Sequence, residues 1–141
     1  MKAYEFFPHT ADVKFRASGK TLEVAFKNAA YALTDTMTNH KKVKGKVNEK
    51  ISIESEDKKA LLYDFLEQFL ILVDSEGFIL NKVKSIKIGR NKKGLKLTAK
   101  VIGDNKPEKY EVDAHIKAVT YQQMIVKKSN GMYILQVILD I

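Results

Sequence analysis

The feature that most limits the possible folds is a run of strand patterns filling the second half of the chain. From Phe78 onward, segments in which apolar and polar residues alternate are separated by short turn signals, of which Asn91-Lys92-Lys93-Gly94 and Ser129-Asn130-Gly131 are the clearest. Turns this short join antiparallel strands. We therefore expect antiparallel hairpins, with strands over about 83–88, 95–102, 110–118, 123–127 and 132–141.

Two helix patterns precede these strands. Thr21 can cap a helix that runs to about Met37, and Asp57 can cap a second helix closed by Gly77. The second helix is apolar over so wide an arc that we expect it at the centre of the core. Shorter strand patterns occupy residues 3–7, 13–17 and 51–53. The sequence predicts an α+β fold in a single domain, residues 1–141, with two helices packed on one face of a largely antiparallel sheet.

The residue types present exclude several classes of protein. The chain has no cysteine, which rules out disulfides, thiolate metal sites and a cysteine nucleophile. Its histidines, His9, His40 and His115, lack the spacing of a zinc site. No apolar run approaches the ~20 residues that cross a bilayer, and the first residues do not resemble a signal peptide. We expect a cytoplasmic protein with no membrane partner.

The net charge of +8 raises the hypothesis of nucleic-acid binding. Nearly all of the positive charge is lysine, because Arg16 and Arg90 are the only arginines, and lysine cannot read guanine edges bidentately. The span Lys82–Gly103 carries eight basic residues and no acid, but it also lacks aromatic residues for base stacking. Loose electrostatic binding of RNA stays open as an alternative function.

One row of charged residues could serve proton transfer. If residues 110–118 form a strand, Glu111, Asp113, His115 and Lys117 share one face of it. The commoner interpretation of such a row is a solvated strand face.

Two acidic positions at the chain ends are more informative. Asp12 follows a polar corner and stands at a strand start, where it could simply cap a turn. Asp140 closes an apolar strand beside the carboxylate of Ile141, and two such groups repel by roughly 1–4 kcal/mol at a protein surface. Either a lysine amine or a hard metal ion with oxygen ligands would reverse that penalty.

Several segments, taken in order, resemble the archease family along almost the whole chain. They are His9-Thr10-Ala11-Asp12-Val13, Gly19-Lys20-Thr21-Leu22-Glu23-Val24-Ala25-Phe26, Ala29-Ala30 with Met37-Thr38, Leu61-Leu62 with Phe65-Leu66, Lys117-Ala118-Val119-Thr120-Tyr121 and Val137-Ile138-Leu139-Asp140-Ile141. The resemblance implies a layered β-β-α sandwich. It also implies a non-catalytic activator of the RtcB-type RNA ligase, promoting ligase guanylylation, multiple turnover and broader nucleotide use in tRNA splicing and RNA repair. The alternative for the family is a chaperone-like modulator of tRNA methylation, whose partners are tRNA or a tRNA methyltransferase.

The resemblance also implies a metal site, usually described with calcium. Its ligands carry over to Asp12, Asp140 and Ile141, the last through its terminal carboxylate, and no residue is expected to be catalytic. His9, Lys117 and Tyr121 are expected to contact the partner. Gln122 stands where the family commonly has a histidine, so we expect no role for that histidine here.

Overall fold

The structure, a computed structural model, describes residues 2–8 and 12–141. In chain order the elements are β1 (Tyr4–Phe7), β2 (Asp12–Gly19), α1 (Leu22–Met37), η1 (His40–Lys42), β3 (Val47–Ser55), α2 (Lys58–Glu76), β4 (Ile79–Asn91), β5 (Gly94–Asp104), η2 (Pro107–Lys109), β6 (Ala118–Ser129) and β7 (Met132–Asp140). The two η elements are single turns of 3-10 helix in the connections.

Local side-chain chemistry sets the helix ends as predicted. The Thr21 hydroxyl accepts a hydrogen bond from the N–H of Val24 at 3.1 Å, and the Asp57 carboxylate accepts one from the N–H of Ala60 at 2.8 Å. Gly77, with φ +64°, ends α2 in the left-handed conformation that favours glycine. Neither helix, nor any other in the described residues, has the length and apolar character needed to cross a membrane.

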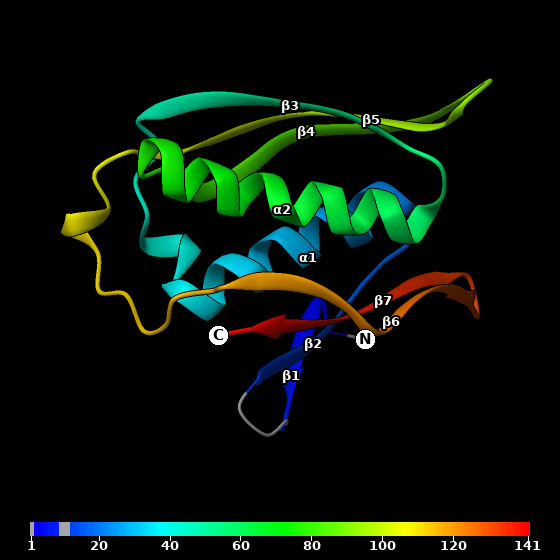
Figure 1. Ribbon diagram of the computed structural model, residues 1–141, viewed down its shortest axis with the longest axis horizontal. Coiled ribbons are helices and arrows are strands. Elements are labelled where there is room, and N and C mark those ends of the chain that lie inside the picture. The colour runs from blue at the N-terminus through cyan, green and yellow to red at the C-terminus, as the bar shows by residue number, and fades with distance from the viewer. Residues whose placement is uncertain (1, 9–11) are drawn as a thin grey trace.

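The strands form two antiparallel sheets, in the orders β1-β2-β7-β6 and β3-β5-β4. Figure 1 shows α1 and α2 lying between them. The helix α1 packs mainly on β2 and also contacts β4, while α2 contacts β6 on one side and β3 on the other. The α+β class, the two helices and the antiparallel pairing are confirmed. The expectation of a single sheet with both helices on one face is wrong, because the strands divide between two sheets and the helices lie between them. A sheet on each side of α2 explains its wide apolar arc.

The predicted strand over 110–118 is wrong, because β6 begins only at Ala118. The preceding segment is held by other bonds. The hydroxyl of Tyr110 donates to Asp104 at 2.5 Å, and the N–H of Asp113 donates to the carbonyl of Met37 at 2.7 Å. The charged row proposed for proton transfer therefore has no strand face to share, and its members are exposed: Glu111, Asp113, His115 and Lys117.

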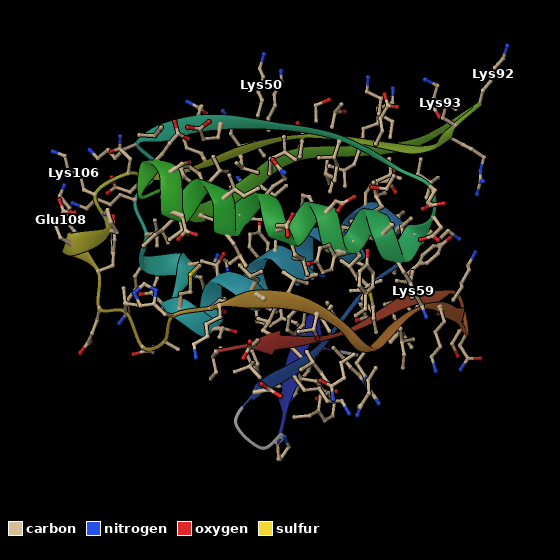
Figure 2. The ribbon with its side chains drawn as sticks, in the orientation of Figure 1. Lys50, Lys59, Lys92, Lys93, Lys106 and Glu108 are labelled. Carbon is tan, nitrogen blue, oxygen red and sulfur yellow. The ribbon has the colours of Figure 1, made fainter. Side chains whose placement is uncertain are left out.

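The two faces of the β3-β5-β4 sheet differ in chemistry. Along β5, the buried residues Leu97, Ala99 and Val101 face the helices, and the intervening residues are exposed. In Figure 2, Lys50 of β3 points away from the helices on the opposite side of this sheet. One face thus contributes to the core and the other meets solvent.

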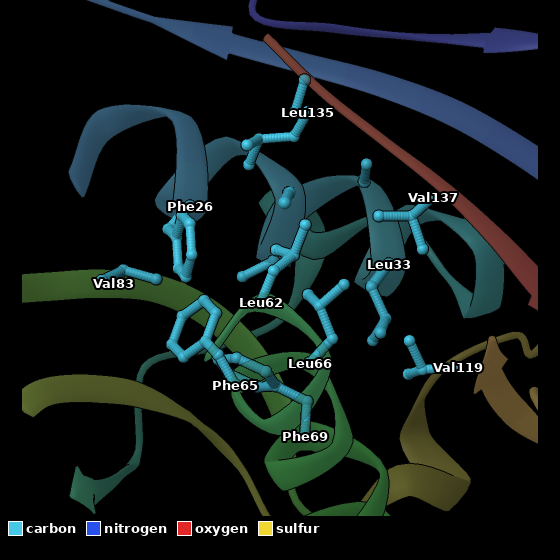
Figure 3. Close-up of a cluster of buried hydrophobic side chains, with 14 of the residues drawn as sticks. Phe26, Leu33, Leu62, Phe65, Leu66, Phe69, Val83, Val119, Leu135 and Val137 are labelled. Carbon is cyan, nitrogen blue, oxygen red and sulfur yellow. The ribbon is translucent and has the colours of Figure 1, made fainter. Parts of the chain in front are cut away.

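A single hydrophobic core connects both sheets through the helices. Figure 3 shows Phe65 of α2 between Phe26 of α1 and Phe69. The ring centroid of Phe65 is 5.7 Å from that of Phe26 and 5.1 Å from that of Phe69. Val83 of β4 and Val137 of β7, from different sheets, belong to the same cluster. Each such side chain stabilises the fold by about 1.5–3 kcal/mol when fully buried. The core therefore fixes the two sheets, and the strand ends they carry, relative to each other.

Candidate functional site

Two acidic residues from opposite ends of the sequence meet across two paired strands. In the antiparallel pairing of β2 with β7, Asp12 is the direct partner of Asp140. Side chains directly opposite each other project from the same face of a sheet, with Cβ atoms roughly 4.5–5.5 Å apart. The pairing continues through eight residues of β2, so the whole register would have to slip to separate the two carboxylates.

The aspartate pair lies on the face of its sheet that points away from the helices. Val13 and Leu139, the neighbours of Asp12 and Asp140 along the strands, pack in or against the hydrophobic core. Because successive side chains alternate between the two faces of a strand, the two carboxylates project outward. Both aspartates are half-buried, which leaves them within reach of solvent ions.

The strand β6 borders the pair on its other side. β7 lies between β2 and β6, and Asp140 is opposite both Asp12 and Ala118. The N–H of Lys117 donates to the carbonyl oxygen of Asp140 at 2.7 Å, and Lys117 itself is exposed. Ile141 follows Asp140 directly. Strand register and the Lys117 bond thus bring together four of the six residues singled out from the sequence: Asp12, Asp140, Ile141 and Lys117. The C label in Figure 1 marks the chain end at this corner.

The donor chemistry at this corner fits a hard cation. Two carboxylates about 5 Å apart repel by about 1–3 kcal/mol, and a divalent ion with a preference for oxygen ligands would reverse the sign of that interaction. Within residues 2–8 and 12–141, no three His, Asp or Glu side chains are grouped in a way that could hold a metal ion. The third donor predicted from the sequence is the terminal carboxylate of Ile141, and that prediction stays untested.

One predicted partner-contacting residue, His9, lies outside the described residues. The prediction made for it stays untested.

Tyr121 lies apart from the aspartates, on the side of β6 that faces α2. Its ring stacks on that of Tyr63, with centroids 4.5 Å apart and planes 6° from parallel, and 54% of the residue remains exposed. Burial, reinforced by the negative charge of Asp64, raises the pKa of Tyr121. The prediction that Tyr121 contacts a partner stays untested, but the exposure of an aromatic pair is compatible with it. Gln122, next in the chain, is also exposed.

A buried glutamine, which the sequence analysis missed, supports the irregular part of β6. Gln136 is 3% exposed; it accepts a hydrogen bond from Arg16 Nε at 2.8 Å and donates one to the carbonyl of Gln123 at 2.8 Å. The register of β6 against β7 shifts between Thr120 and Ile125, and Gln123 has φ +52°. A positive φ is uncommon outside glycine, so the neighbouring structure must hold it. A single polar residue inside the apolar run Ile134–Leu139 was the signal that could have revealed this contact.

The Gln136 contacts belong to a polar network on the same outward face as the aspartates. Lys14 Nζ donates to the side chain of Gln123 at 3.2 Å, and the Arg16 guanidinium lies 4.9 Å above the ring of Phe7. The amine of Lys14, two residues from Asp12 along β2, thus bonds to the amide oxygen of Gln123.

Comparison with known proteins places this arrangement in context. The model of the Archease protein family matches residues 4–141. The protein archease of Thermococcus kodakarensis is 41% identical over 143 residues, and the match covers both chains completely. The solution structure of protein 1598 of Methanobacterium thermoautotrophicum has a TM-score of 0.87 and 37% identity, with both chains fully covered. A crystal structure of an archease from Thermotoga maritima, called a possible chaperone, shares the fold at a TM-score of 0.57 and 16% identity, over 96% of this chain and 94% of that one.

Proposed function

The chain belongs to the archease family, and from that membership we propose that it activates an RtcB-type tRNA-splicing RNA ligase without catalysing a reaction itself. It would promote guanylylation of the ligase, sustain multiple turnover and broaden nucleotide use in tRNA splicing and RNA repair. The setting of this activity would be the cytoplasm.

The observation that carries the proposal is the register pairing of Asp12 with Asp140. A divalent cation, for which calcium is the proposed identity, would bind the two carboxylates together with the terminal carboxylate of Ile141. Oxygen donors of this kind are the ligands that calcium prefers. The ion would join the first long strand to the last one and turn a repulsive corner into a rigid, charged contact surface.

Activation would proceed by protein–protein contact at this corner. Lys117 is exposed and bonded through its N–H to Asp140, so an ion at the aspartates would also fix the start of β6. Tyr121, the fourth residue of β6, offers an exposed ring on the side of that strand that faces α2. His9 is the third residue proposed to contact the partner. The role of the ion is electrostatic and structural, and no chemical step passes through it.

The test is guanylylation of the purified ligase by GTP, followed with and without the activator. Wild-type protein with calcium is expected to accelerate formation of the ligase–guanylate intermediate. Asp12→Ala and Asp140→Ala are each expected to fold, with unchanged far-ultraviolet circular dichroism, and to lose the stimulation.

Glu108→Gln supplies the matched control, because Glu108 is an exposed acid in η2. It removes one negative charge, as each aspartate variant does, and is expected to stimulate fully. Full stimulation by both aspartate variants would overturn the proposed role of the metal site. No stimulation by the wild-type protein would overturn the function itself.

A second candidate function is chaperone-like modulation of tRNA methylation. The lysine-rich strands β4 and β5 favour it, since they could hold tRNA for a methyltransferase. Methyl transfer to tRNA by a methyltransferase, measured with and without this protein, separates the two: a changed pattern of methylated positions, with no effect on ligase guanylylation, would favour the second function.

A further inference from the structure

The outward face of the β3-β5-β4 sheet gathers lysines from all three strands. We call this surface the lysine face and define it by six exposed residues: Lys50, Lys82, Lys84, Lys87, Lys96 and Lys100. Figure 2 shows Lys50 projecting from it, away from the helices. The lysine face lies on the sheet that does not carry the aspartate pair.

Strand register places these lysines side by side. Lys50 of β3 is the direct partner of Lys100 of β5, which in turn is opposite Ser85 of β4. Lys84, beside Ser85, reaches across β5 and donates to the Asn48 side chain of β3 at 3.3 Å. With strands about 4.8 Å apart and a rise of about 3.3 Å per residue, the six lysines spread over roughly 10 Å by 20 Å.

Negative charge is nearly absent from this face. Among the exposed outward residues of the three strands as the structure describes them, Glu54, opposite Lys96, is the one acid. The half-buried Glu49 also reaches this face, beside Lys50. Acidic residues instead occur on and just before α2, in the layer behind this sheet: Asp57, Asp64, Glu67, Asp74 and Glu76. The lysine face therefore presents a local excess of about four positive charges, which attracts a polyanion.

The surface between the lysines is hollowed. One depression of about 400 Å³ is bordered by Lys50, Lys87 and Lys100. Another of about 540 Å³ is bordered by Lys50, Lys84 and Lys100, with Asn48 and the acid Glu49 also on its rim. A third, of about 280 Å³, lies between Lys87 and Lys96 beside Arg90. The three adjoin one another along the strands because they share these lysines. Anionic groups could enter these depressions with an ammonium group on more than one side.

We propose that the lysine face binds the phosphate backbone of double-helical RNA, independently of its sequence. None of the three strands places an aromatic side chain on this face, so unpaired bases would find nothing to stack on. The face is defined by lysines, which act as point charges toward phosphates and do not read base edges bidentately. A broad and rigid sheet surface suits a duplex, which proteins recognise mostly through its shape and its phosphates. The choice of RNA over DNA rests on the proposed function.

The experiment measures fluorescence anisotropy of a labelled RNA hairpin with a 16-base-pair stem, titrated with the isolated protein at several salt concentrations. Wild-type protein is expected to bind, with an affinity that falls steeply as salt rises. The triple variant Lys50→Gln/Lys84→Gln/Lys100→Gln is expected to bind about tenfold or more weakly. Its salt slope should be smaller by about 3, one for each phosphate contact removed.

Two further variants keep the result interpretable. Lys41→Gln/Lys59→Gln/Lys127→Gln removes three exposed charges outside the lysine face and is expected to bind as the wild-type protein does. Lys50→Arg/Lys84→Arg/Lys100→Arg keeps the charge and is expected to retain binding, which separates loss of charge from loss of fold.

The proposal is overturned if the lysine-face variant and the control lose affinity equally, or if an unpaired RNA of the same length binds more tightly than the hairpin. It is also overturned if the lysine-face variant binds RNA normally but fails to stimulate ligase guanylylation in the absence of RNA, because the face would then contact the ligase. Failure of the proposed function is distinguishable, since the anisotropy measurement contains no ligase.

Discussion

Asp12 and Asp140 stand directly opposite each other in the pairing of β2 with β7, although 127 residues lie between them in the sequence. Their strands run antiparallel through the middle of a four-stranded sheet, so the position of one carboxylate is set by the register of the other. Two carboxylates this close repel each other, and a shared cation would reverse the sign of that interaction.

Removing one of the two charges should therefore stabilise the metal-free protein. Asp140→Asn is expected to raise the free energy of unfolding by about 1 kcal/mol in a chelator, because the repulsion between the paired carboxylates is removed. Urea denaturation followed by circular dichroism measures it. Glu108→Gln is the comparison, with an expected change of about 0.5 kcal/mol or less. A destabilised Asp140→Asn protein in chelator would contradict this account of the pair.

The Gln136 side chain should be important for stability as well as for the shape of β6. Gln136→Leu removes both bonds, leaving the carbonyl of Gln123 without this donor, and is expected to cost about 1–3 kcal/mol. Chemical denaturation measures the loss. Gln122→Leu, in the same irregular segment but exposed, should change stability by about 0.5 kcal/mol or less. Equal effects of the two variants would show that the Gln136 bonds do not hold the segment.

The hydrogen bond between Tyr110 and Asp104 predicts a pH dependence. The bond donated by Tyr110 lowers the pKa of Asp104 below its usual value near 3.8. A carboxyl group with a lowered pKa in the folded protein stabilises it above the unfolded-state pKa, and this contribution is lost as pH falls through the folded-state pKa. Asp104→Asn should thus be less stable than the wild-type protein at pH 7, and the difference should shrink below about pH 4.

Urea denaturation at pH 7, 5, 4 and 3 tests this dependence, with Tyr110→Phe as a second variant. It removes the donor to Asp104 and also the hydroxyl that accepts from the N–H of Lys44, a bond that does not depend on the charge of Asp104. Both variants should show the same convergence with the wild-type protein in acid. A stability difference that stays constant from pH 7 to pH 3 would show that the bond does not depend on the charge of Asp104.

Phe65 tests the layer of helices between the two sheets. It is fully buried and packs against both Phe26 and Phe69, so Phe65→Ala is expected to cost about 3–5 kcal/mol. Ile71, on the same helix, is 47% exposed, and Ile71→Ala should cost about 1 kcal/mol or less. The two melting temperatures, measured together, check this. Similar losses would place the centre of the core elsewhere.

The sequence predicted the elements that depend on local chemistry. Thr21 and Asp57 cap their helices, and Asn130-Gly131 makes a hairpin turn with both residues at positive φ, because capping and turn formation involve residues close in the chain. The segment before Ala118 was mistaken for a strand, since its alternation is real but its bonds go to Asp104 and the end of α1. Partition of the strands into two sheets depends on long-range packing, which periodicity does not encode.

The site was predictable to a similar degree. Asp12 and Asp140 could be singled out from the sequence, and the family resemblance predicted that they bind the same ion. The structural reason that they are neighbours, the register of β2 with β7, could not be read from the sequence. The partners in two contacts lie far apart in the chain, so the sequence pattern does not identify them: Tyr63 for Tyr121, and Arg16 for Gln136. For Gln136, its place inside an apolar run signals only that a buried polar contact exists. The lysine face was visible in part, as a basic span, but Lys50 joins it only through the pairing of β3 with β5.

A calcium titration by isothermal calorimetry tests the central claim most directly. The wild-type protein, stripped of metal, is expected to bind one calcium ion per chain, and Asp12→Asn and Asp140→Asn are each expected to lose that binding while Glu108→Gln keeps it. Wild-type protein that binds no divalent ion, or aspartate variants that bind calcium as tightly as the wild-type protein, would contradict the account.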